Sequence, residues 1–351
     1  AGMVPFKPYF MGRAVPPARR LTTVQRCFRT TDIESVGDTT HHTFFEMLGN
    51  FSVGDYFKEE AIPWAWEFCT RVLGLPAERL WITVYTDDDE AAEIWRRLGI
   101  PEERILRYGA DEGNFWYSGD VGPCGPCSEL HYDFGEEFGC GPVCEPKHDC
   151  GRFLEIWNLV FMTYMRHEDG SLTELPQKNI DTGAGLERVA MAVQGVRSTY
   201  ETDGLRALLD AAAALCGRPY GRDAKADQAL RVVVDHARAV TFLIADGVLP
   251  SNEGRGYVLR RVLRRAVFFG RAVAMPAGFM ERMALRVIEQ FRARYPYLTN
   301  EERLICSVVA REEALFRETL ERGLAKLDEL LDQVRGTADA LPGEEVYRLY
   351  E

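Results

Sequence analysis

The pattern of expected secondary structure changes near residue 200, and this change constrains the fold more than any single motif. Residues 1–196 alternate strand-like runs, such as 80–85 and 153–164, with short helices such as 91–98 and with Gly/Pro turns. From residue 203 onward the chain has helical periodicity with few strand-like runs. The expected helices are 205–215, 228–246, 257–271, 279–294 and 301–331.

This division predicts two domains, a mixed α/β domain over residues 1–196 and an all-helical domain over residues 197–351. The length of 351 residues agrees with two or three domains of roughly 150 residues each. Periodicity alone does not distinguish an antiparallel sheet from a parallel one, so the type of sheet stays open at this level.

Composition narrows the class of protein. The hydrophobic fraction of 46% and the charged fraction of 27% are ordinary for a globular enzyme. No apolar run approaches the roughly 18 residues of a membrane-spanning helix, and the first residues lack the features of a secretion signal. Nine cysteines in such a chain predict free thiols or metal ligands in a cytoplasmic protein. The net charge of −12 means that any RNA contact depends on local basic patches.

Residues 158–195 read as a strand, a glycine-containing turn and a helix. Gly183 and Gly185 would let the backbone approach a ligand closely, and the helix would turn its free N–H groups toward an anion. Arg188 adds a planar guanidinium suited to phosphate. The expected apolar face of the helix comprises Leu186, Val189, Ala190 and Val193, and Gly195 ends it. On these residues alone, an ordinary strand–turn–helix packing unit is an equal alternative.

A second segment predicts a long hairpin. Two runs rich in aromatic and β-branched residues, 25–32 and 41–51, flank a Gly/Asp/Thr stretch. Arg29 on one arm and Phe45 on the other suit a nucleotide, because a guanidinium binds phosphate and a ring stacks on a base. The alternatives are a surface arginine and a core ring.

With these two segments the chain resembles the alanyl-tRNA synthetases, a family of class II aminoacyl-tRNA synthetases. Arg29 and Asp32 are similar to the arginine and acid of motif 2, and Asp-Thr-Gly-Ala-Gly-Leu-Glu-Arg (181–188) is similar to motif 3. Other similar segments follow in the family's order. They are His-His-Thr-Phe-Phe-Glu-Met-Leu-Gly-Asn-Phe (41–51), Gly-Pro-Cys-Gly-Pro-Cys-Ser-Glu (122–129), Glu-Ile-Trp-Asn (155–158) and Pro-Ser-Asn-Glu-Gly-Arg-Gly-Tyr-Val-Leu-Arg-Arg (250–261).

The resemblance implies an α+β fold, with an antiparallel sheet flanked by helices and then an all-helical domain that recognises the tRNA acceptor stem. It implies ATP-dependent activation of L-alanine to alanyl-adenylate and transfer of alanine to the 3′ end of tRNA(Ala), with no DNA or membrane partner. One alternative is a non-catalytic RNA-binding or regulatory paralogue. Another is a synthetase for a different small amino acid.

The resemblance also implies site residues. The catalytic residues are Arg29, Asp32 and Arg188. The ATP site comprises Arg29, Phe45, Met47, Glu155, Gly183, Gly185 and Arg188, with Arg188 stacking the adenine against Phe45. The alanine site comprises Trp116, Asn158, Val160 and Asp181. Glu155 and Asn158 offer the oxygen ligands that Mg²⁺ prefers, and Asp181 is expected to hold the α-ammonium group, to cap the next helix, or both.

Four soft ligands lie within eleven residues, in a Gly/Pro-rich stretch. They are Cys140, Cys144, His148 and Cys150. This spacing suits a closed, structural Zn²⁺ site. A mixed site that uses Cys124 or Cys127, and reduced thiols that only pack together, are the alternatives.

RNA recognition is expected in the helical half. Arg255, Arg260, Arg261, Arg264 and Arg265 are clustered at one helix, which favours phosphate contacts over a solvated face with acidic partners. Asn252 is similar to the family residue that reads a G·U pair in the acceptor stem. Glu351 stands where the family has a second reader, an aspartate. The predicted tRNA-binding residues are therefore Asn252, Arg255, Arg260, Arg261, Arg264 and Glu351.

Two parts of the family pattern are not found. The chain starts at residues that follow the strand of motif 1, and no two of its six histidines are four apart, as the family's His-x-x-x-His editing motif requires. We therefore expect a piece of a longer protein, without the start of motif 1 and without the editing domain.

Overall fold

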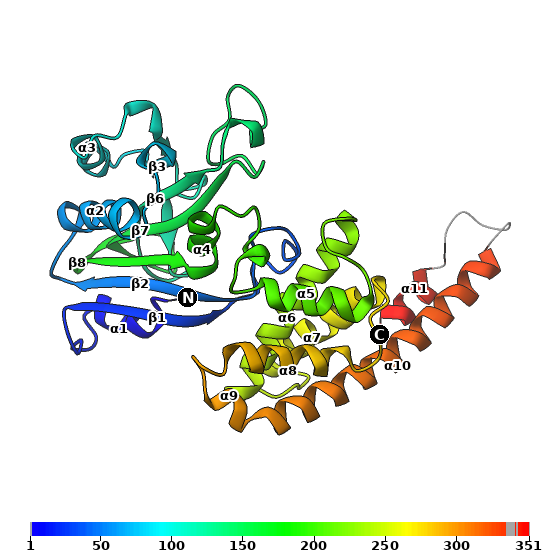
Figure 1. Cartoon of the computed structure of the whole chain (residues 1–351). Coiled ribbons are helices and arrows are strands. Elements are labelled where there is room, and N and C mark those ends of the chain that lie inside the picture. The colour runs from blue at the N-terminus through cyan, green and yellow to red at the C-terminus, as the bar shows by residue number, and fades with distance from the viewer. Residues whose placement is uncertain (1, 335–340, 342, 351) are drawn as a thin grey trace. The chain divides into compact units, whose positions relative to one another are not determined.

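The computed structural model describes residues 2–334, 341 and 343–350. The backbone divides into two compact units. The first unit comprises residues 1–31 and 44–204, and the second comprises residues 32–43 and 205–351 (Figure 1). The sequence predicted a boundary between residues 196 and 197, but it gave no indication that 32–43 would pack with the helical half.

An eight-stranded sheet forms the centre of the first unit. Its strands are β1 (Arg20–Phe28), β2 (Phe44–Val53), β3 (Leu80–Tyr85), β4 (Ile105–Tyr108), β5 (Phe115–Tyr117), β6 (Gly122–Asp133), β7 (Phe153–Arg166) and β8 (Leu172–Gly185). The order is β1-β2-β8-β7-β6-β3-β4, with β5 paired to β6. All the pairs are antiparallel except β3 with β4. The predicted antiparallel sheet is confirmed.

The two faces of this sheet are covered differently. The helices of the unit are α1 (Lys7–Phe10), α2 (Lys58–Glu67), α3 (Asp89–Arg97) and α4 (Leu186–Gln194), with short helical turns η1 (Val4–Phe6), η2 (Phe68–Val72), η3 (Ala77–Arg79), η4 (Glu102–Arg104), η5 (Glu136–Phe138) and η6 (Thr199–Glu201). One face packs against α2 and α3 in a large apolar core that includes Ile62 and Trp95. On the other face Met3 and Phe10 cover a smaller cluster around Phe51 and Val160. This second face carries the candidate site.

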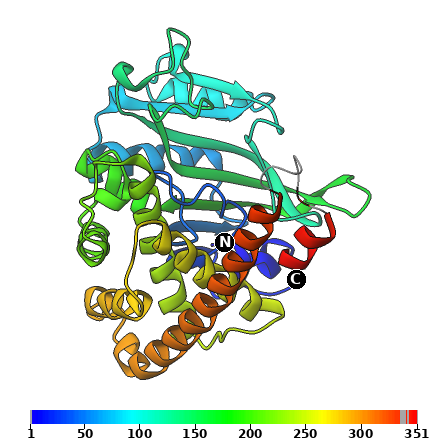
Figure 2. The same ribbon diagram turned by 90° about the vertical axis from the view of Figure 1, so that its right-hand side faces the viewer.

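The second unit is helical. Its helices are α5 (Arg206–Cys216), α6 (Ala224–Ala245), α7 (Gly254–Ala272), α8 (Phe279–Phe291), α9 (Tyr297–Asn300), α10 (Glu302–Val334) and α11 (Gly343–Tyr350). Every residue of α6 from Val232 to Phe242 is buried, so this helix forms the centre of the unit. Figure 2 shows α10 as the long helix coloured orange to red. Among the described helices, none is both long and apolar enough to cross a membrane.

Most predicted elements of secondary structure are confirmed. The expected strand 80–85 is β3, and the expected helices of the second half are α5 to α8 and α10, with ends shifted by a few residues. The hairpin is confirmed as β1 and β2, which pair in continuous register from Arg20↔Ser52 to Phe28↔Phe44. Asn252 lies in the loop before α7, as expected.

Candidate active site

Strand register places the predicted nucleotide residues of the hairpin on one face. Cys27 of β1 pairs with Phe45 of β2, and Arg29 lies two residues beyond Cys27, so the three side chains share a side of the hairpin. The Arg29 guanidinium carbon is 5.3 Å from the centre of the Phe45 ring, which is 9% exposed. The structure thus stacks Arg29 on Phe45, and the stacking of adenine between Phe45 and Arg188 stays a prediction.

The end of β8 corrects one expectation. β8 runs to Gly185 and α4 begins at Leu186, so no separate turn joins them. Gly183 and Gly185 do not have positive φ angles. Gly183 has a different role, because a Cβ atom there would lie 3.0 Å from the sulfur of Met47. The glycine therefore allows β2 and β8 to pack closely beneath the candidate site.

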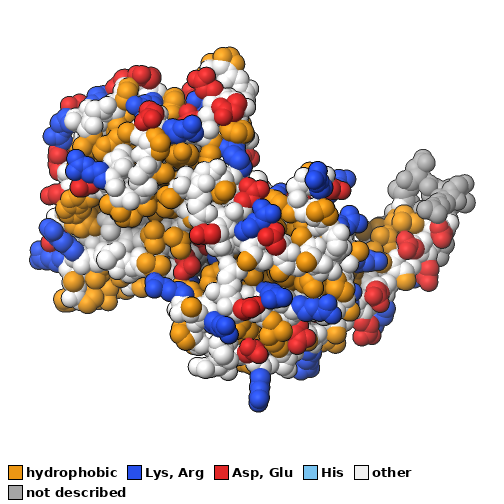
Figure 3. Space-filling model, in the orientation of Figure 1, with side chains coloured by type: hydrophobic (Ala, Val, Ile, Leu, Met, Phe, Trp, Pro, Cys, Tyr) orange, Lys and Arg blue, Asp and Glu red, His pale blue; other side chains and the backbone are white. Residues whose placement is uncertain are grey.

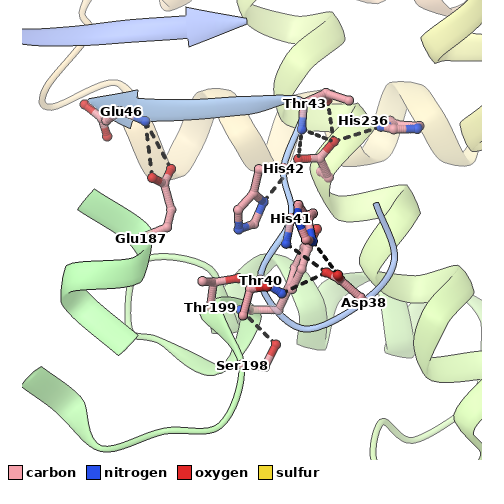
Figure 4. Close-up of polar contacts among 12 residues, drawn as sticks. Asp38, Thr40, His41, His42, Thr43, Glu46, Glu187, Ser198, Thr199 and His236 are labelled. Atoms are coloured by element: carbon pink, nitrogen blue, oxygen red, sulfur yellow. Dashed lines mark hydrogen bonds and ion pairs between the residues drawn. The ribbon is translucent and has the colours of Figure 1, made fainter. Parts of the chain in front are cut away.

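The first helix after this strand buries a different face from the one predicted. Val193 is 50% exposed, whereas Glu187 is buried. Glu187 accepts hydrogen bonds from the backbone N–H of Glu46 at 3.2 and 3.3 Å (Figure 4). Apolar periodicity did not predict the burial of Glu187, because a buried carboxylate needs a hydrogen-bond donor, and here that donor is the backbone N–H of Glu46 on β2. Gly195 ends the helix with φ +65°, as predicted.

Arg188 lies on the first turn of α4 and contacts β7. Its Nη1 atom donates to the Glu155 carboxylate at 3.0 Å and to the Glu155 carbonyl oxygen at 3.3 Å. The two side chains are 24% and 37% exposed. The ion pair therefore lies within reach of a ligand from solvent.

A bulge in β7 brings Glu155 to the same face as Asn158. Asn158 pairs with Glu129 of β6 and Glu155 pairs with His131, so Ile156 is an extra residue on β7. Glu129 and His131 are two residues apart and share a face, and their partners therefore do so as well. Without the bulge, side chains three residues apart on a strand would point to opposite faces.

Glu129 is the centre of a polar network that the sequence did not single out. Its carboxylate accepts hydrogen bonds from Asn158 Nδ2 at 2.9 Å and from Thr83 Oγ1 at 3.3 Å, and it lies 3.2 Å from His131 Nε2. Burial, followed by the negative charge of Glu155, raises the pKa of Glu129 above its usual value. The sequence did offer one indication of this role: Glu129 alternates with Cys127 and His131 along β6, so all three side chains lie on one face of a strand that reaches the site.

The predicted alanine residues lie together on this face. Val160 of β7 pairs directly with Asp181 of β8, and Trp116 packs against the apolar cluster that contains Val160. Asp181 is 7% exposed, and burial raises the pKa of its carboxyl group to about 7. Gly185 is the N-cap residue of α4. Asp181 lies four residues before it within β8, so the expectation that Asp181 caps this helix is wrong.

One side-chain atom of Asn158 makes no hydrogen bond among the described residues. Its Nδ2 donates to Glu129, whereas its buried Oδ1 has no hydrogen-bond partner among the described residues. A buried acceptor of this kind favours a ligand that donates a hydrogen bond. The face thus combines an arginine over an aromatic ring, an arginine paired with Glu155, and a buried carboxylate next to a small apolar wall.

The family model described as "tRNA synthetases class II (A)" matches residues 1–351, which is the whole chain. The chain belongs to the class II tRNA synthetases. Similar curated proteins are named alanine–tRNA ligase. They come from Dehalococcoides mccartyi strain CBDB1 (54% identical), Desulforamulus reducens (55%) and Carboxydothermus hydrogenoformans (56%). Each alignment covers 100% of this chain but 40% of the relative, so the chain spans less than half the length of these synthetases.

A solved histidyl-tRNA synthetase from S. aureus aligns with 52% of this chain and 47% of its own, at 13% identity and a TM-score of 0.32. This likeness is too weak to support an argument about the site. The confirmed membership in the class II synthetases rests on the family model and on the sheet itself.

The cysteine-rich loop of this class II synthetase gathers its predicted ligands. The sulfur atoms of Cys140, Cys144 and Cys150 all lie within 4.8 Å of one another. His148 Nδ1 is 3.3 Å from Cys140 Sγ, and Cys144 Sγ is 3.4 Å from Cys150 Sγ. The spacings of the three thiols are compatible with one metal ion, because tetrahedral Zn–S bonds of about 2.3 Å place sulfur atoms less than 4 Å apart. His148 lies next to Cys140 but is not part of this compact group of thiols, so its role as the fourth ligand stays a prediction.

The alternative zinc ligands lie elsewhere. Cys124 and Cys127 are buried in β6, and neither belongs to the group of thiols in the loop. The structure therefore favours the loop residues alone over a mixed set.

The arginines predicted to contact RNA lie on α7 among acidic side chains. Arg260 and Arg264 both pair with Glu312 of α10, at 2.9 and 3.1 Å, and Arg261 pairs with Glu34 at 3.1 Å. In Figure 3, the visible face of the helical unit likewise has Lys and Arg interspersed with Asp and Glu. Pairing with acidic side chains is the alternative to phosphate contact that the sequence left open.

Asn252, Asp32 and Glu351 are the remaining residues for which the sequence predicted a role. Arg260 Nη1 donates to the side-chain oxygen of Asn252, which orients that exposed amide. Asp32 belongs to the segment 32–43 of the second unit, where its carbonyl oxygen accepts the Ser35 N–H at 3.0 Å. Glu351 lies outside the described residues.

Proposed function

We propose that this chain forms alanyl-adenylate from ATP and L-alanine and transfers the alanyl group to the 3′ end of tRNA(Ala) in the cytoplasm. The observation that carries the proposal is the buried carboxylate of Asp181 beside Val160. An amino acid presents an α-ammonium group next to a small side chain, and Asp181 with this apolar wall suits both. The names of the relatives support the same substrate.

In the proposed reaction the alanine carboxylate attacks the α-phosphate of ATP and pyrophosphate leaves. Arg29 is suited to hold the α-phosphate and the attacking carboxylate, since its guanidinium is always charged and offers paired donors. Phe45 supplies a ring beneath the nucleotide. Arg188, at the start of α4, can neutralise charge on the leaving phosphates. This chemistry depends on positioning and charge stabilisation, which these three side chains provide.

Mg²⁺ fits the acidic side of the same face. Glu155 is partly exposed and Glu129 is nearby, which gives two carboxylates where Mg²⁺ takes one or two and the substrate phosphates. Burial is the main cause of the raised pKa of Glu129, and the negative charge of Glu155 adds to it, so a cation bound beside Glu155 would favour the ionised form of Glu129. Bound Mg²⁺ would neutralise charge on the phosphates.

Zn²⁺ at Cys140, Cys144, His148 and Cys150 is a second part of the proposal. The clustered thiols support it, because a loop with few apolar residues gains order from a metal. With all four ligand positions filled by protein, the role of the metal is structural.

The RNA part of the proposal rests on α7 and the loop before it. Asn252 is exposed and can both donate and accept a hydrogen bond, as reading a base edge in the shallow minor groove of an RNA helix requires. Arg255, Arg260, Arg261 and Arg264 would contact phosphates. For this, Arg260 and Arg264 must release Glu312, and Arg261 must release Glu34. Glu351 stays a proposed tRNA contact on the resemblance alone, and on the same basis Asp32 stays a proposed catalytic residue of motif 2.

One experiment separates these functions. Alanine-dependent ATP–pyrophosphate exchange should be present, with glycine and serine weaker as substrates. One methyl group is worth only about 1–3 kcal/mol, so glycine should be rejected incompletely. A chain that binds tRNA without any exchange activity would instead be the non-catalytic paralogue. Exchange with a preference for another small amino acid would support the third alternative.

A further inference from the structure

A buried aspartate in the second unit collects hydrogen bonds from the hairpin loop. Asp235 lies on α6 and is completely buried. Its carboxylate accepts the backbone N–H of Thr43 at 3.0 and 3.2 Å and the Thr43 hydroxyl. His42 Nδ1 lies 3.1 Å from one of its oxygens, and His236 Nδ1 lies 2.8 Å from the other (Figure 4). Thr43 and Asp235 are 192 residues apart in the chain.

The network continues to α7. Arg265 Nη1 lies 2.9 Å from His236 Nε2, and an arginine can only donate. His236 therefore accepts at Nε2 and donates from Nδ1 to Asp235, which makes it a neutral imidazole. Burial, together with the neighbouring Arg265, lowers the pKa of His236 and agrees with this assignment. We call these five residues the Asp235 cluster: His42, Thr43, Asp235, His236 and Arg265.

The rest of the loop is held at its carbonyl groups. Arg265 Nη2 donates to Val36 O at 3.1 Å, and Arg231 Nε of α6 donates to Gly37 O at 2.6 Å. Within the loop, Asp38 accepts the N–H of His41 at 2.8 Å. Two helices thus fix the backbone of the segment 32–43 at several points.

This segment is covalently continuous with the residues proposed to bind ATP. It begins three residues after Arg29 and ends at Thr43, directly before Phe44. Phe44 pairs with Phe28 at the last rung of the hairpin, and Phe45 lies under Arg29. A shift of the Thr43 backbone therefore moves the strand end that carries Phe45.

We propose that the Asp235 cluster positions the ATP-binding end of the hairpin through the backbone of Thr43, which directly precedes Phe44 and Phe45. The members are positioning residues and not catalytic ones. The inference rests on the proposed adenylate-forming function.

The first test removes one hydroxyl group. Thr43→Val keeps the size of the side chain and the backbone N–H but deletes the hydroxyl that contacts Asp235. Thr43→Ser keeps the hydroxyl and is the matched control. Thr43→Val should lower kcat/KM for ATP in pyrophosphate exchange about tenfold, the factor that ~1.4 kcal/mol represents, because the lost hydrogen bond is made to a charged group. Thr43→Ser should stay close to wild type.

The readout must separate positioning from folding. The KM for alanine should change less than the KM for ATP in Thr43→Val. Arg29 is proposed to hold the alanine carboxylate, but the rest of the alanine site, Trp116, Val160 and Asp181, lies on β5, β7 and β8 and not on the hairpin. A merely structural role would lower the thermal midpoint and leave both KM values and the turnover per folded molecule at the wild-type level. That outcome would overturn the inference.

A double-mutant cycle tests whether the cluster acts as one unit. Arg265→Gln should lower kcat/KM for ATP to an extent similar to that of Thr43→Val, and the double mutant should be little worse than either. Two independent effects would multiply, to about a hundredfold if each is tenfold, and would contradict a connected cluster. Arg286→Gln, which breaks an exposed ion pair with Glu289 on α8, is the matched surface control. If Thr43→Val does not fold, Arg265→Gln alone still decides through the two KM values.

Failure of the inference differs from failure of the proposed function. Wild-type protein without alanine-dependent exchange would remove the proposed function. Active wild type, with unchanged ATP kinetics in both variants, would remove only the positioning role.

Discussion

The guanidinium of Arg188 and the carboxylate of Glu155 form an ion pair on the open face of the sheet, with 3.0 Å between Nη1 and Oε2. Both groups are proposed to contact ATP, the first through phosphate and the second through Mg²⁺. The pair satisfies each charge in the absence of substrate. Binding of the metal-bound nucleotide would replace this contact by one between each residue and its own ligand.

Loss of either arginine should impair adenylate formation. Arg29→Ala or Arg188→Ala should reduce alanine-dependent pyrophosphate exchange by at least ~10²-fold, the scale of removing one group that stabilises developing charge. Arg188→Lys should restore little, because an ammonium lacks the planar fork. Arg206→Ala, which breaks an exposed pair with Asp210, serves as the control. Near-normal exchange in either alanine variant would remove that arginine from the site.

Alanine binding should depend on pH through Asp181. Because burial raises its pKa to about 7, the carboxylate that would hold the ammonium group is largely protonated below that pH. The KM for alanine should therefore rise about tenfold from pH 8 to pH 6, as expected for a single group that ionises near 7. Asp181→Asn should raise this KM at pH 8 and remove the pH dependence. A wild-type KM that is constant over this range would contradict the assignment.

The raised pKa of Asp181 also predicts how the stability of the ligand-free protein depends on pH. A carboxyl whose pKa is raised on folding stabilises the protein only while it is protonated. This contribution is complete below the unfolded pKa of about 3.9 and is lost as the pH rises through about 7. Asp181→Asn should thus raise the thermal midpoint of the ligand-free protein at pH 8, and the gain should shrink as the pH falls toward 5. Thermal unfolding at matched ionic strength would measure it.

Metal analysis should find about one zinc per chain in purified protein. Cys144→Ser or Cys150→Ser should lose the metal and lower the thermal midpoint, because the ion orders the loop. Cys306→Ser on α10 should keep it. Metal-free wild-type protein with full activity would leave the clustered thiols as packing residues.

If α7 and the loop before it bind RNA as proposed, base reading by Asn252 and phosphate contact by the arginines of α7 should separate in mutants. Asn252→Ala should spare pyrophosphate exchange and lower tRNA charging roughly 5- to 150-fold, the range of ~1–3 kcal/mol for one base-edge contact by analogy with DNA. Discrimination between a G·U-bearing tRNA and one with a standard pair should shrink. Arg264→Ala should weaken both tRNAs alike and flatten the salt dependence. Equal loss for both tRNAs in Asn252→Ala would make it a loop support.

Arg260→Ala is expected to combine the two effects, because Arg260 holds the Asn252 amide as well as Glu312. Charging of both tRNAs should fall, and selectivity should fall with it. The structure changes the expectation from sequence here, since spacing along α7 had suggested a phosphate contact alone.

Local patterns predicted the elements of this fold well. β3, the helices from α5 to α8 and α10 follow from hydrophobic periodicity, because each one buries apolar side chains on one face. The antiparallel sheet did not follow from periodicity, and it was predicted through the family resemblance. The positions of Val160 and Asp181 on one face also agree with that resemblance.

Features that depend on distant partners were missed. Segment 32–43 packs with the helical unit because Asp235, far along the chain, accepts the Thr43 N–H. Glu129 and Glu187 were not singled out, since their roles depend on donors from other strands. Arg265 was grouped with the RNA-contacting arginines by spacing, whereas it contacts His236 and the Val36 carbonyl.

The extra residue at Ile156 has a consequence for the tolerance of β7 to change. Deleting one residue at this point would give a strand that pairs more regularly with β6, yet the phase of every side chain before the deletion would reverse. Glu155 would then face the apolar layer of α2 and α3, and Arg188 would lose its partner. The candidate site therefore requires the bulge in β7. A one-residue deletion at this point should impair the site more than most single substitutions in the strand.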